Sequence, residues 1–231
     1  CCAAYCLQSG NENIAIGDAA GKCLTTGISN IFLGKYSGQK NTTGSCNIFL
    51  GRYIGSQTEH TGNQNVFIGR GASEWNTSGS CNISIGCGAN RKNSTGTHNI
   101  ALGSFAMQDG VTTGSYNIAF GVNSGKDITS GEHNILLGCC AGKSIAEGGC
   151  NIVIGMNAGC AMIADSNVDD NIAIGRYAGA FLDGSTNVII GKEALVGNAS
   201  YAGVSHNTAI GYAALQNTRG MHNVGLGRDA G

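Results

Sequence analysis

The stretch "TGSCNIFLG" at residues 43–51 has a near copy 35 residues later, "SGSCNISIG" at residues 78–86. Each copy places an asparagine four residues before a glycine. This spacing occurs 13 times in the 231 residues, and successive asparagines lie 16 to 20 residues apart, most often 17. A repeat of nearly constant length is typical of stacked architectures, so it decides the fold. The asparagines are Asn13, Asn30, Asn47, Asn65, Asn82, Asn99, Asn117, Asn134, Asn151, Asn171, Asn187, Asn207 and Asn223.

A unit of about 17 residues is too short for a pair of helices, but it suits one coil of a β-solenoid. We therefore predict an all-β fold, a β-solenoid of about 13 rungs, as a single repeat domain over residues 1–231. Residues 1–13 align without gaps on residues 139–151, so the chain begins and ends in the middle of a repeat. We expect it to be a segment of a longer repetitive protein.

We number each unit from its asparagine, which makes the following glycine position 5. The recurring asparagine is predicted to form a ladder of side-chain amides along the stack; a turn-ending role is the alternative. Positions 2 and 4 are apolar with period two, as in Ile14 and Ile16, which predicts that they form the buried face of a strand. Position 8 is mostly alanine, which suits a narrow inward corner.

Strand alternation then points position 3 outward, although this position is often apolar. Outward apolar residues need cover, and association with identical chains is the simplest cover. We therefore expect a homotrimer, with position 3 at the chain interface. The apolar residues at this position are Phe32, Phe49, Phe67, Leu136, Val153 and Ile189.

The composition of the chain argues against nucleic acid and membrane as partners. Charged residues make up 12% of the chain and the formal net charge is −1, so no basic surface for nucleic acid is expected. The apolar runs are short, so we expect no membrane insertion. The chain has 39 glycines and no proline, which suits a backbone that donates hydrogen bonds at nearly every residue. No cofactor is expected.

Several repeats resemble those of known fibres. "TTGSYNIAFGVNSG" (112–125) and "NTAIGYAALQNT" (207–218) are similar to the TG-x-x-N-x-x-x-G-x-x-A repeats of tail-fibre and related virion proteins of tailed bacteriophages. The cysteine-bearing forms "GCCAGKS" and "TGSCN" resemble fibres of phages that infect marine cyanobacteria. Head repeats of trimeric autotransporter adhesins are a more distant likeness, with a shorter period. The resemblance implies a homotrimeric, elongated fibre on a virion surface or other extracellular appendage, spacing or carrying a receptor-binding tip.

Two repeats are longer than the others, residues 151–170 and 187–206, and their extra residues fall in polar stretches. Loops on a rigid scaffold often carry binding sites. We predict a polar patch for a glycan there, and tolerated insertions without a role are the equal alternative. The candidate residues are Asp165, Asn167, Asp169, Asn198, Tyr201 and His206.

The residue before each ladder asparagine is often a soft metal ligand. Thiolate and imidazole bind Zn²⁺, so the position is a weak candidate for a metal site. Serine, glutamine, tyrosine, aspartate and threonine also occupy it, which favours a semi-buried polar corner. The candidates are Cys81, His98, His133, Cys150, His206 and His222.

Position 6 is basic in six repeats and is followed by tyrosine in three of them. A basic and aromatic stripe suits contact with anionic sugars, although a solvated corner is the favoured interpretation. The basic residues are Lys35, Arg52, Arg70, Arg176, Lys192 and Arg228, and the tyrosines are Tyr36, Tyr53 and Tyr177.

The sequence thus predicts a structural fibre segment of a phage tail fibre or similar surface appendage. It would space or present a receptor-binding element and contact host-surface glycans. We expect no enzyme and no catalytic residue, because the 14 acidic residues are scattered and only Asp169 and Asp170 are adjacent. The alternatives are a polysaccharide-acting β-solenoid enzyme and an adhesin of a bacterial surface.

Overall fold

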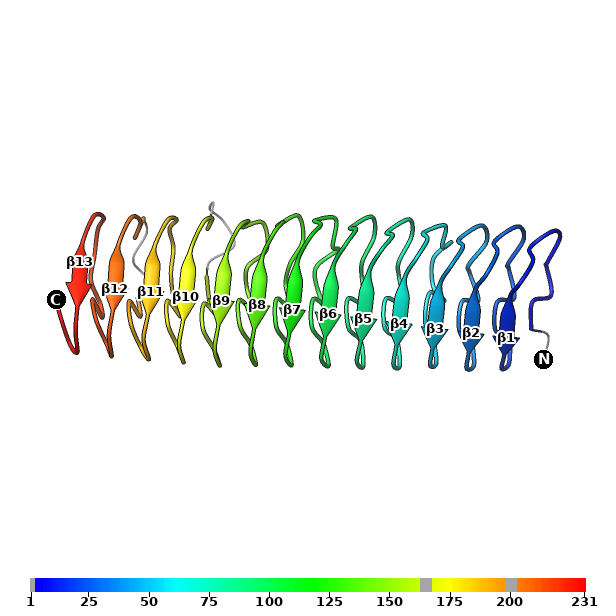
Figure 1. Cartoon of the computed structure of the whole chain (residues 1–231), viewed down its shortest axis with the longest axis horizontal. Coiled ribbons are helices and arrows are strands. Elements are labelled where there is room, and N and C mark those ends of the chain that lie inside the picture. The colour runs from blue at the N-terminus through cyan, green and yellow to red at the C-terminus, as the bar shows by residue number, and fades with distance from the viewer. Residues whose placement is uncertain (1–2, 163–167, 198–202) are drawn as a thin grey trace. The chain divides into compact units, whose positions relative to one another are not determined.

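The computed structural model describes residues 3–162, 168–197 and 203–231, and it is all-β (Figure 1). Each ladder asparagine is followed directly by a strand of three residues, and glycine at position 5 follows the strand. Side chains of the β-branched and aliphatic types fill these strands, as their strand propensity predicts. The strands are β1 (Ile14–Ile16), β2 (Ile31–Leu33), β3 (Ile48–Leu50), β4 (Val66–Ile68), β5 (Ile83–Ile85), β6 (Ile100–Leu102), β7 (Ile118–Phe120), β8 (Ile135–Leu137), β9 (Ile152–Ile154), β10 (Ile172–Ile174), β11 (Val188–Ile190), β12 (Thr208–Ile210) and β13 (Val224–Leu226).

The chain divides into two compact units, Cys1–Ser115 with β1 to β6 and Tyr116–Gly231 with β7 to β13. Within each unit every strand pairs in parallel with the next strand of the chain. The register places equal repeat positions side by side, as Phe32 beside Phe49 in β2 and β3. Each repeat is therefore one coil of a β-solenoid, which confirms the predicted fold class.

The asparagine ladder is present in both units and is saturated with hydrogen bonds. Asn47 donates from its Nδ2 to Asn30 Oδ1 at 3.1 Å and to the Gly62 carbonyl at 2.9 Å. Its own Oδ1 accepts from the backbone N and the Nδ2 of Asn65. These side chains are buried, so the ladder satisfies polar groups that water cannot reach. The predicted ladder is confirmed.

The ladder keeps its register when the repeat length changes. Asn171 follows Asn151 by 20 residues and Asn187 follows Asn171 by 16, yet each donates its backbone N to the preceding Oδ1 at 3.0 Å. Additional residues are therefore accommodated without shifting the strands.

The orientation of the strand residues is the reverse of the prediction. Position 3, predicted to face outward, is buried in every strand after β1, and its largest side chains are 0% exposed. Positions 2 and 4, predicted to be buried, are half-buried or exposed. The physical reason is alternation: the asparagine at position 1 points inward, so position 3 also points inward and positions 2 and 4 point outward. The position 3 residues concerned are Phe32, Phe49, Phe67, Leu136, Val153 and Ile189; the position 2 and 4 residues include Ile14, Ile16, Ile31, Leu33, Ile48 and Leu50.

The core of each coil lies between position 3 and the small residue at position 8. In the first unit Phe49 stacks on Phe67 with ring centroids 4.8 Å apart, and Phe32 packs tilted against Phe49 at 5.2 Å. Alanine at position 8 is fully buried, as in Ala20 and Ala72, which confirms the predicted narrow corner. The core is completed by a third set of buried side chains at position 12. These include Leu24, Ile128, Ile145, Met162 and Leu182.

Candidate functional site

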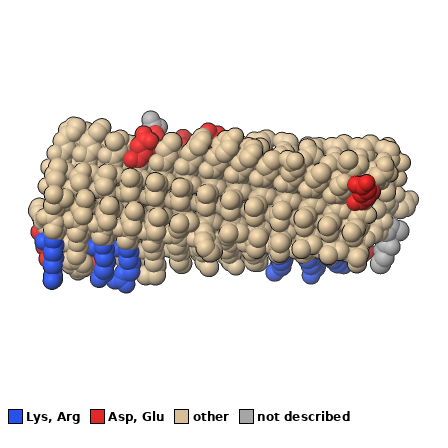
Figure 2. Space-filling model, in the orientation of Figure 1, with Lys and Arg blue, Asp and Glu red and all other residues tan. Residues whose placement is uncertain are grey.

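The outward residues of the strands form an apolar surface in each unit, which we call the sheet face. In the first unit all twelve side chains at positions 2 and 4 of β1 to β6 are Ile, Leu or Val. In the second unit Thr208 is the only polar residue at the corresponding positions of β7 to β13. Figure 2 shows the blue Lys and Arg side chains in separate groups at one edge of a broad surface of uncharged residues. The sheet face is thus apolar and carries no charge.

The predicted metal candidates lie in an exposed column on the outside of the coils. The residue before each ladder asparagine has a positive φ, for example 57° at His98 and 59° at His133, which turns its side chain away from the core. The rings of His206 and His222 stack at 5.0 Å. Within the described residues, no group of three or more His, Cys, Asp or Glu side chains could hold a metal ion. Cys81 donates instead to Gln64 Oε1, and Cys150 is an exposed free thiol.

Two of the six predicted glycan-binding residues lie in the described structure. Asp169 accepts a hydrogen bond from the Gly149 backbone N at 2.7 Å, so its carboxylate ties two adjacent coils together. His206 belongs to the exposed column and stacks on His222. The other four candidates, Asp165, Asn167, Asn198 and Tyr201, lie outside the described residues.

The basic and aromatic stripe is a set of cation–π pairs. Lys35 Nζ lies 4.9 Å from the Tyr36 ring centroid, and the Arg52 guanidinium carbon lies 4.4 Å from that of Tyr53. The two tyrosine rings stack at 5.4 Å. A hydrogen bond from Lys35 to Asp18 raises the pKa of this lysine.

The second unit has the same kind of pair, with looser geometry. The Arg176 guanidinium carbon lies 5.5 Å from the Tyr177 ring centroid. Lys192 and Arg228 lie 5.2 and 5.3 Å from the ring of Tyr212, one coil away from each. The stripe is therefore an ordered surface in both units.

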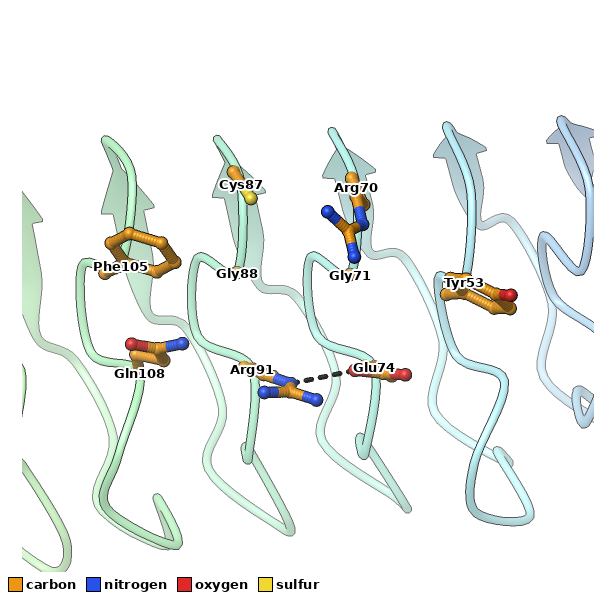
Figure 3. A pocket seen from close by; sticks show the side chains of 9 residues that line it. All are labelled: Tyr53, Arg70, Gly71, Glu74, Cys87, Gly88, Arg91, Phe105 and Gln108. Carbon is orange, nitrogen blue, oxygen red and sulfur yellow. Dashed lines mark hydrogen bonds and ion pairs between the residues drawn. The ribbon is translucent and has the colours of Figure 1, made fainter.

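A hollow interrupts this stripe in the first unit. Its volume is about 290 Å³, and Gly71 and Gly88 form its floor (Figure 3). Tyr53 bounds it at one end and Phe105 at the other, each from a different coil. In Figure 3 the strands lie behind the segments that carry these side chains, so the hollow opens on a different side of the coil from the sheet face.

Of the two arginines in the hollow, one is paired with a carboxylate and the other is not. Arg91 Nε donates to Glu74 Oε2 at 2.8 Å, and Gln57 Nε2 donates to Glu74 Oε1 at 3.2 Å. Glu74 is 8% exposed, so this carboxylate is held within the wall. Arg70 also lines the hollow and makes no side-chain hydrogen bond or ion pair with the described residues. The hollow therefore carries one unpaired positive charge.

Of the residues that line this hollow, the sequence had pointed to two, Arg70 and Tyr53, as members of the basic and aromatic stripe. Glu74 and Arg91 sit at the same position of adjacent coils, 17 residues apart, and that equal register is the signal that pairs them. The glycines at residues 71 and 88 stand where neighbouring repeats have aromatic residues. This interruption is the sequence signal for a gap.

A second hollow of about 360 Å³ lies beside Trp75, whose ring is 43% exposed. Its walls are mostly apolar, with Val111 opposite and Lys92 as the charged group. It offers hydrophobic contact but little that would define the chemistry of a ligand.

His60 is a titratable group buried in the core of the first unit. The His60 ring is 0% exposed and lies 5.3 Å from Phe49, with its Nδ1 3.1 Å from the Asn76 amide nitrogen. Burial lowers its pKa from 6.5 to about 4. The ring is too enclosed to reach a ligand, so it belongs to the structure of the core.

By its fold the chain is a β-solenoid repeat protein with a buried asparagine ladder, and this architecture is compatible with a structural fibre. Comparison with protein-family models, curated proteins and solved structures finds no match. None of the described segments forms a helix long and apolar enough to cross a membrane.

Proposed function

We propose that this chain is a structural segment of a fibre, a shaft that assembles with identical chains through its sheet face. The observation that carries the proposal is the uncharged apolar surface at positions 2 and 4. In the first unit it covers roughly 300 Å², from six strands about 4.8 Å apart and three residues long. An apolar patch of this size is comparable to the largest patch of a typical monomer, which is often functional.

The regular spacing of the sheet face favours a second copy of the chain as its partner. Side chains of each column recur at the strand spacing within each unit, as Ile31, Ile48 and Val66 do. Another copy has columns with the same spacing, so the side chains can interlock at every coil. A partner of different fold would match such a surface over a few coils only.

Three copies are the arrangement that we propose. Three flat sheets around a common axis bury both outward columns of every strand, and they leave the turns at the outside. The basic and aromatic stripe would then face solvent. In this arrangement the shaft spaces or presents a receptor-binding element and contacts host-surface glycans.

The likeness to tail-fibre repeats supports a place for the protein on a virion surface or a similar extracellular appendage. We favour this role over a polysaccharide-cleaving enzyme. Glycoside hydrolysis commonly uses two carboxylates on either side of the scissile bond. The hollow is lined by one carboxylate, Glu74, which Arg91 holds in an ion pair.

Charged substitutions on the sheet face test the proposal. Ile85 and Ile190 are each 38% exposed, so lysine at both positions is tolerated by a single chain but brings six charges to the axis of a trimer. We expect this double variant to elute from gel filtration as a smaller species than the wild type, with an unchanged far-ultraviolet circular dichroism spectrum. The matched control is lysine at Thr26 and Thr95, which are exposed turn residues. Equal elution of the wild type and both variants would contradict the proposal.

A further inference from the structure

We infer that the hollow between Tyr53 and Phe105 is a binding site for a sugar that carries a carboxylate, such as a uronic or sialic acid residue of a polysaccharide. The inference deepens the proposed function, since it rests on this segment facing glycans at a surface. It is carried by three observations: the gap in the aromatic column, the unpaired Arg70 and the fixed Arg91–Glu74 pair.

The two glycines of the floor are not required by the backbone. Position 7 is in the left-handed region at Gly71 and Gly88, with φ of 66° and 63°, but Tyr53 and Phe105 have the same conformation, with φ of 62° and 61°. The chain therefore accepts a large side chain at this position.

Packing does not require these glycines either. A Cβ added at Gly71 would approach no atom closer than Glu74 Oε2, at 3.6 Å. At Gly88 the nearest atom would be a ring carbon of Phe105, at 3.1 Å, which a small ring rotation relieves. Glycines at position 5 differ, because a Cβ on Gly86 would lie 2.6 Å from the carbonyl carbon of Gly103. What Gly71 and Gly88 provide is empty space.

The shape of that space suits a sugar. Tyr53 and Phe105 are three coils apart, about 14 Å at the usual strand spacing, and their rings stand at the two ends of the floor formed by Gly71 and Gly88. A volume of about 290 Å³ is at the lower end for ligand sites, as a monosaccharide or disaccharide unit requires. Aromatic rings offer the apolar contact that the carbon–hydrogen face of a sugar ring makes, and the surrounding polar groups fix its hydroxyls.

The charges select an acidic sugar over a neutral one. Among the described residues the Arg70 guanidinium has no hydrogen-bond or ion-pair partner, and this planar group binds a carboxylate through two parallel hydrogen bonds. Arg91 is held at its Nε by Glu74 and still presents its terminal nitrogens. Glu74 Oε1 accepts from Gln57, so the one carboxylate of the wall is engaged on both oxygens. The excess positive charge would thus attract an anion into the hollow.

Titration of the wild-type protein with four probes tests the site. The probes are methyl glucuronide and N-acetylneuraminic acid, with methyl glucoside as the neutral sugar and acetate as the bare carboxylate. Saturation-transfer difference NMR should give saturable binding of at least one acidic sugar. The glucoside and acetate should bind at least about tenfold more weakly, because each lacks one half of the contacts. Equal affinity for acidic and neutral sugars, or no saturable binding, would overturn the inference.

Two variants locate the binding, and each has a matched control. Arg70→Gln should weaken it about tenfold or more, whereas Arg176→Gln, at the same repeat position in the second unit, should leave it unchanged. Filling the hollow with Gly71→Tyr and Gly88→Tyr should abolish it, whereas Asn157→Tyr at the same repeat position should not. Wild-type affinity in the filled variant, or equal effects of Arg70→Gln and Arg176→Gln, would refute the site.

The molecular mass of the same samples separates this inference from the proposed function. Loss of sugar binding in a trimer would refute the site and retain the shaft. Sugar binding by a monomer would support the site and contradict the shaft.

Discussion

Asn47 donates two hydrogen bonds to a single atom of Asn30, from its backbone N at 3.0 Å and from its Nδ2 at 3.1 Å. The acceptor is the Oδ1 of Asn30, and both residues are 0% exposed. The backbone N bond recurs between neighbouring coils in each unit, and the Nδ2 bond accompanies it at most of them but not at Asn82, so one side chain per coil satisfies a strand end and fixes the register. We therefore expect the stability of this β-solenoid to depend on the asparagine ladder.

Removal of one ladder amide in the middle of a unit should be strongly destabilising. Asn65→Ala leaves the Asn82 backbone N and the Gly79 carbonyl without their partners at 3.0 Å. Unsatisfied buried groups cost about 1–3 kcal/mol each, so we expect a loss of about 3 kcal/mol or more in the free energy of unfolding. Urea denaturation at one protein concentration measures it.

The control for this substitution is Asn223→Ala in the last coil. Asn223 is only half-buried and donates to Asn207, and its own Oδ1 accepts no bond from another asparagine of the described residues. We expect a loss of about 1 kcal/mol. Equal losses at Asn65 and Asn223 would show that the ladder does not stabilise the stack.

Alanine should destabilise the protein to different extents at two glycines with positive φ. At Gly86 the φ is 135°, and the new Cβ would lie 2.6 Å from the Gly103 carbonyl carbon. We expect Gly86→Ala to lower the free energy of unfolding by about 3 kcal/mol or more, through strain and coil separation. At Gly71 the φ is 66° and the space is open, so Gly71→Ala should cost about 1 kcal/mol. Thermal unfolding of the two variants side by side gives the comparison, and the reverse order would contradict the assigned packing.

Stability should fall on acidification because of His60. The pKa of His60 is about 4 in the folded state, lowered by burial from 6.5, so below pH 6.5 the unfolded state binds a proton that the folded state does not. The destabilisation begins near pH 6.5, grows as the pH falls and levels off near pH 4, at about 3 kcal/mol. Urea denaturation between pH 7 and pH 4 measures this slope.

The matched variants for this effect are His60→Gln and His133→Gln. Glutamine does not titrate, so His60→Gln should flatten the slope even if it lowers stability at every pH. His133 is exposed and stacks on Tyr116, and its replacement should leave the slope as in the wild type. An unchanged slope in His60→Gln would mean that this ring is not buried in solution.

The period of the repeat was sufficient to predict the fold class and the ladder, but not the phase of the strands. Alternation allows either position 3 or positions 2 and 4 to face inward. Positions 2 and 4 are the more regularly apolar, so the sequence alone favours them as the core. Asn47 and its equivalents decide the phase, because a buried amide at position 1 places Phe49 inside and Ile48 outside. The variation in side-chain size at position 3, from Phe67 to Ser84, indicates that this position faces inward. Core side chains of one coil vary in size because a small residue at one position is compensated by a larger one opposite it.

The candidate site was only partly predictable for a different reason. The basic and aromatic stripe could be read from Arg52 and Tyr53, because both recur at fixed positions. The hollow depends on an absence in two adjacent coils, at Gly71 and Gly88, and on which arginine Glu74 binds. The equal register of Glu74 and Arg91 in adjacent coils indicates their pairing, but only the packing of the side chains shows that Arg70 lies outside it.

The solution mass of the unmodified chain tests the central claim most directly. Multi-angle light scattering after gel filtration under reducing conditions is the measurement, and one chain has a mass of 23.4 kDa. The account predicts three times that mass, about 70 kDa, with the sheet faces of three chains buried against one another. A mass of 23.4 kDa over the working range of concentration would contradict it, because the apolar sheet face would then be exposed to water in a stable single chain.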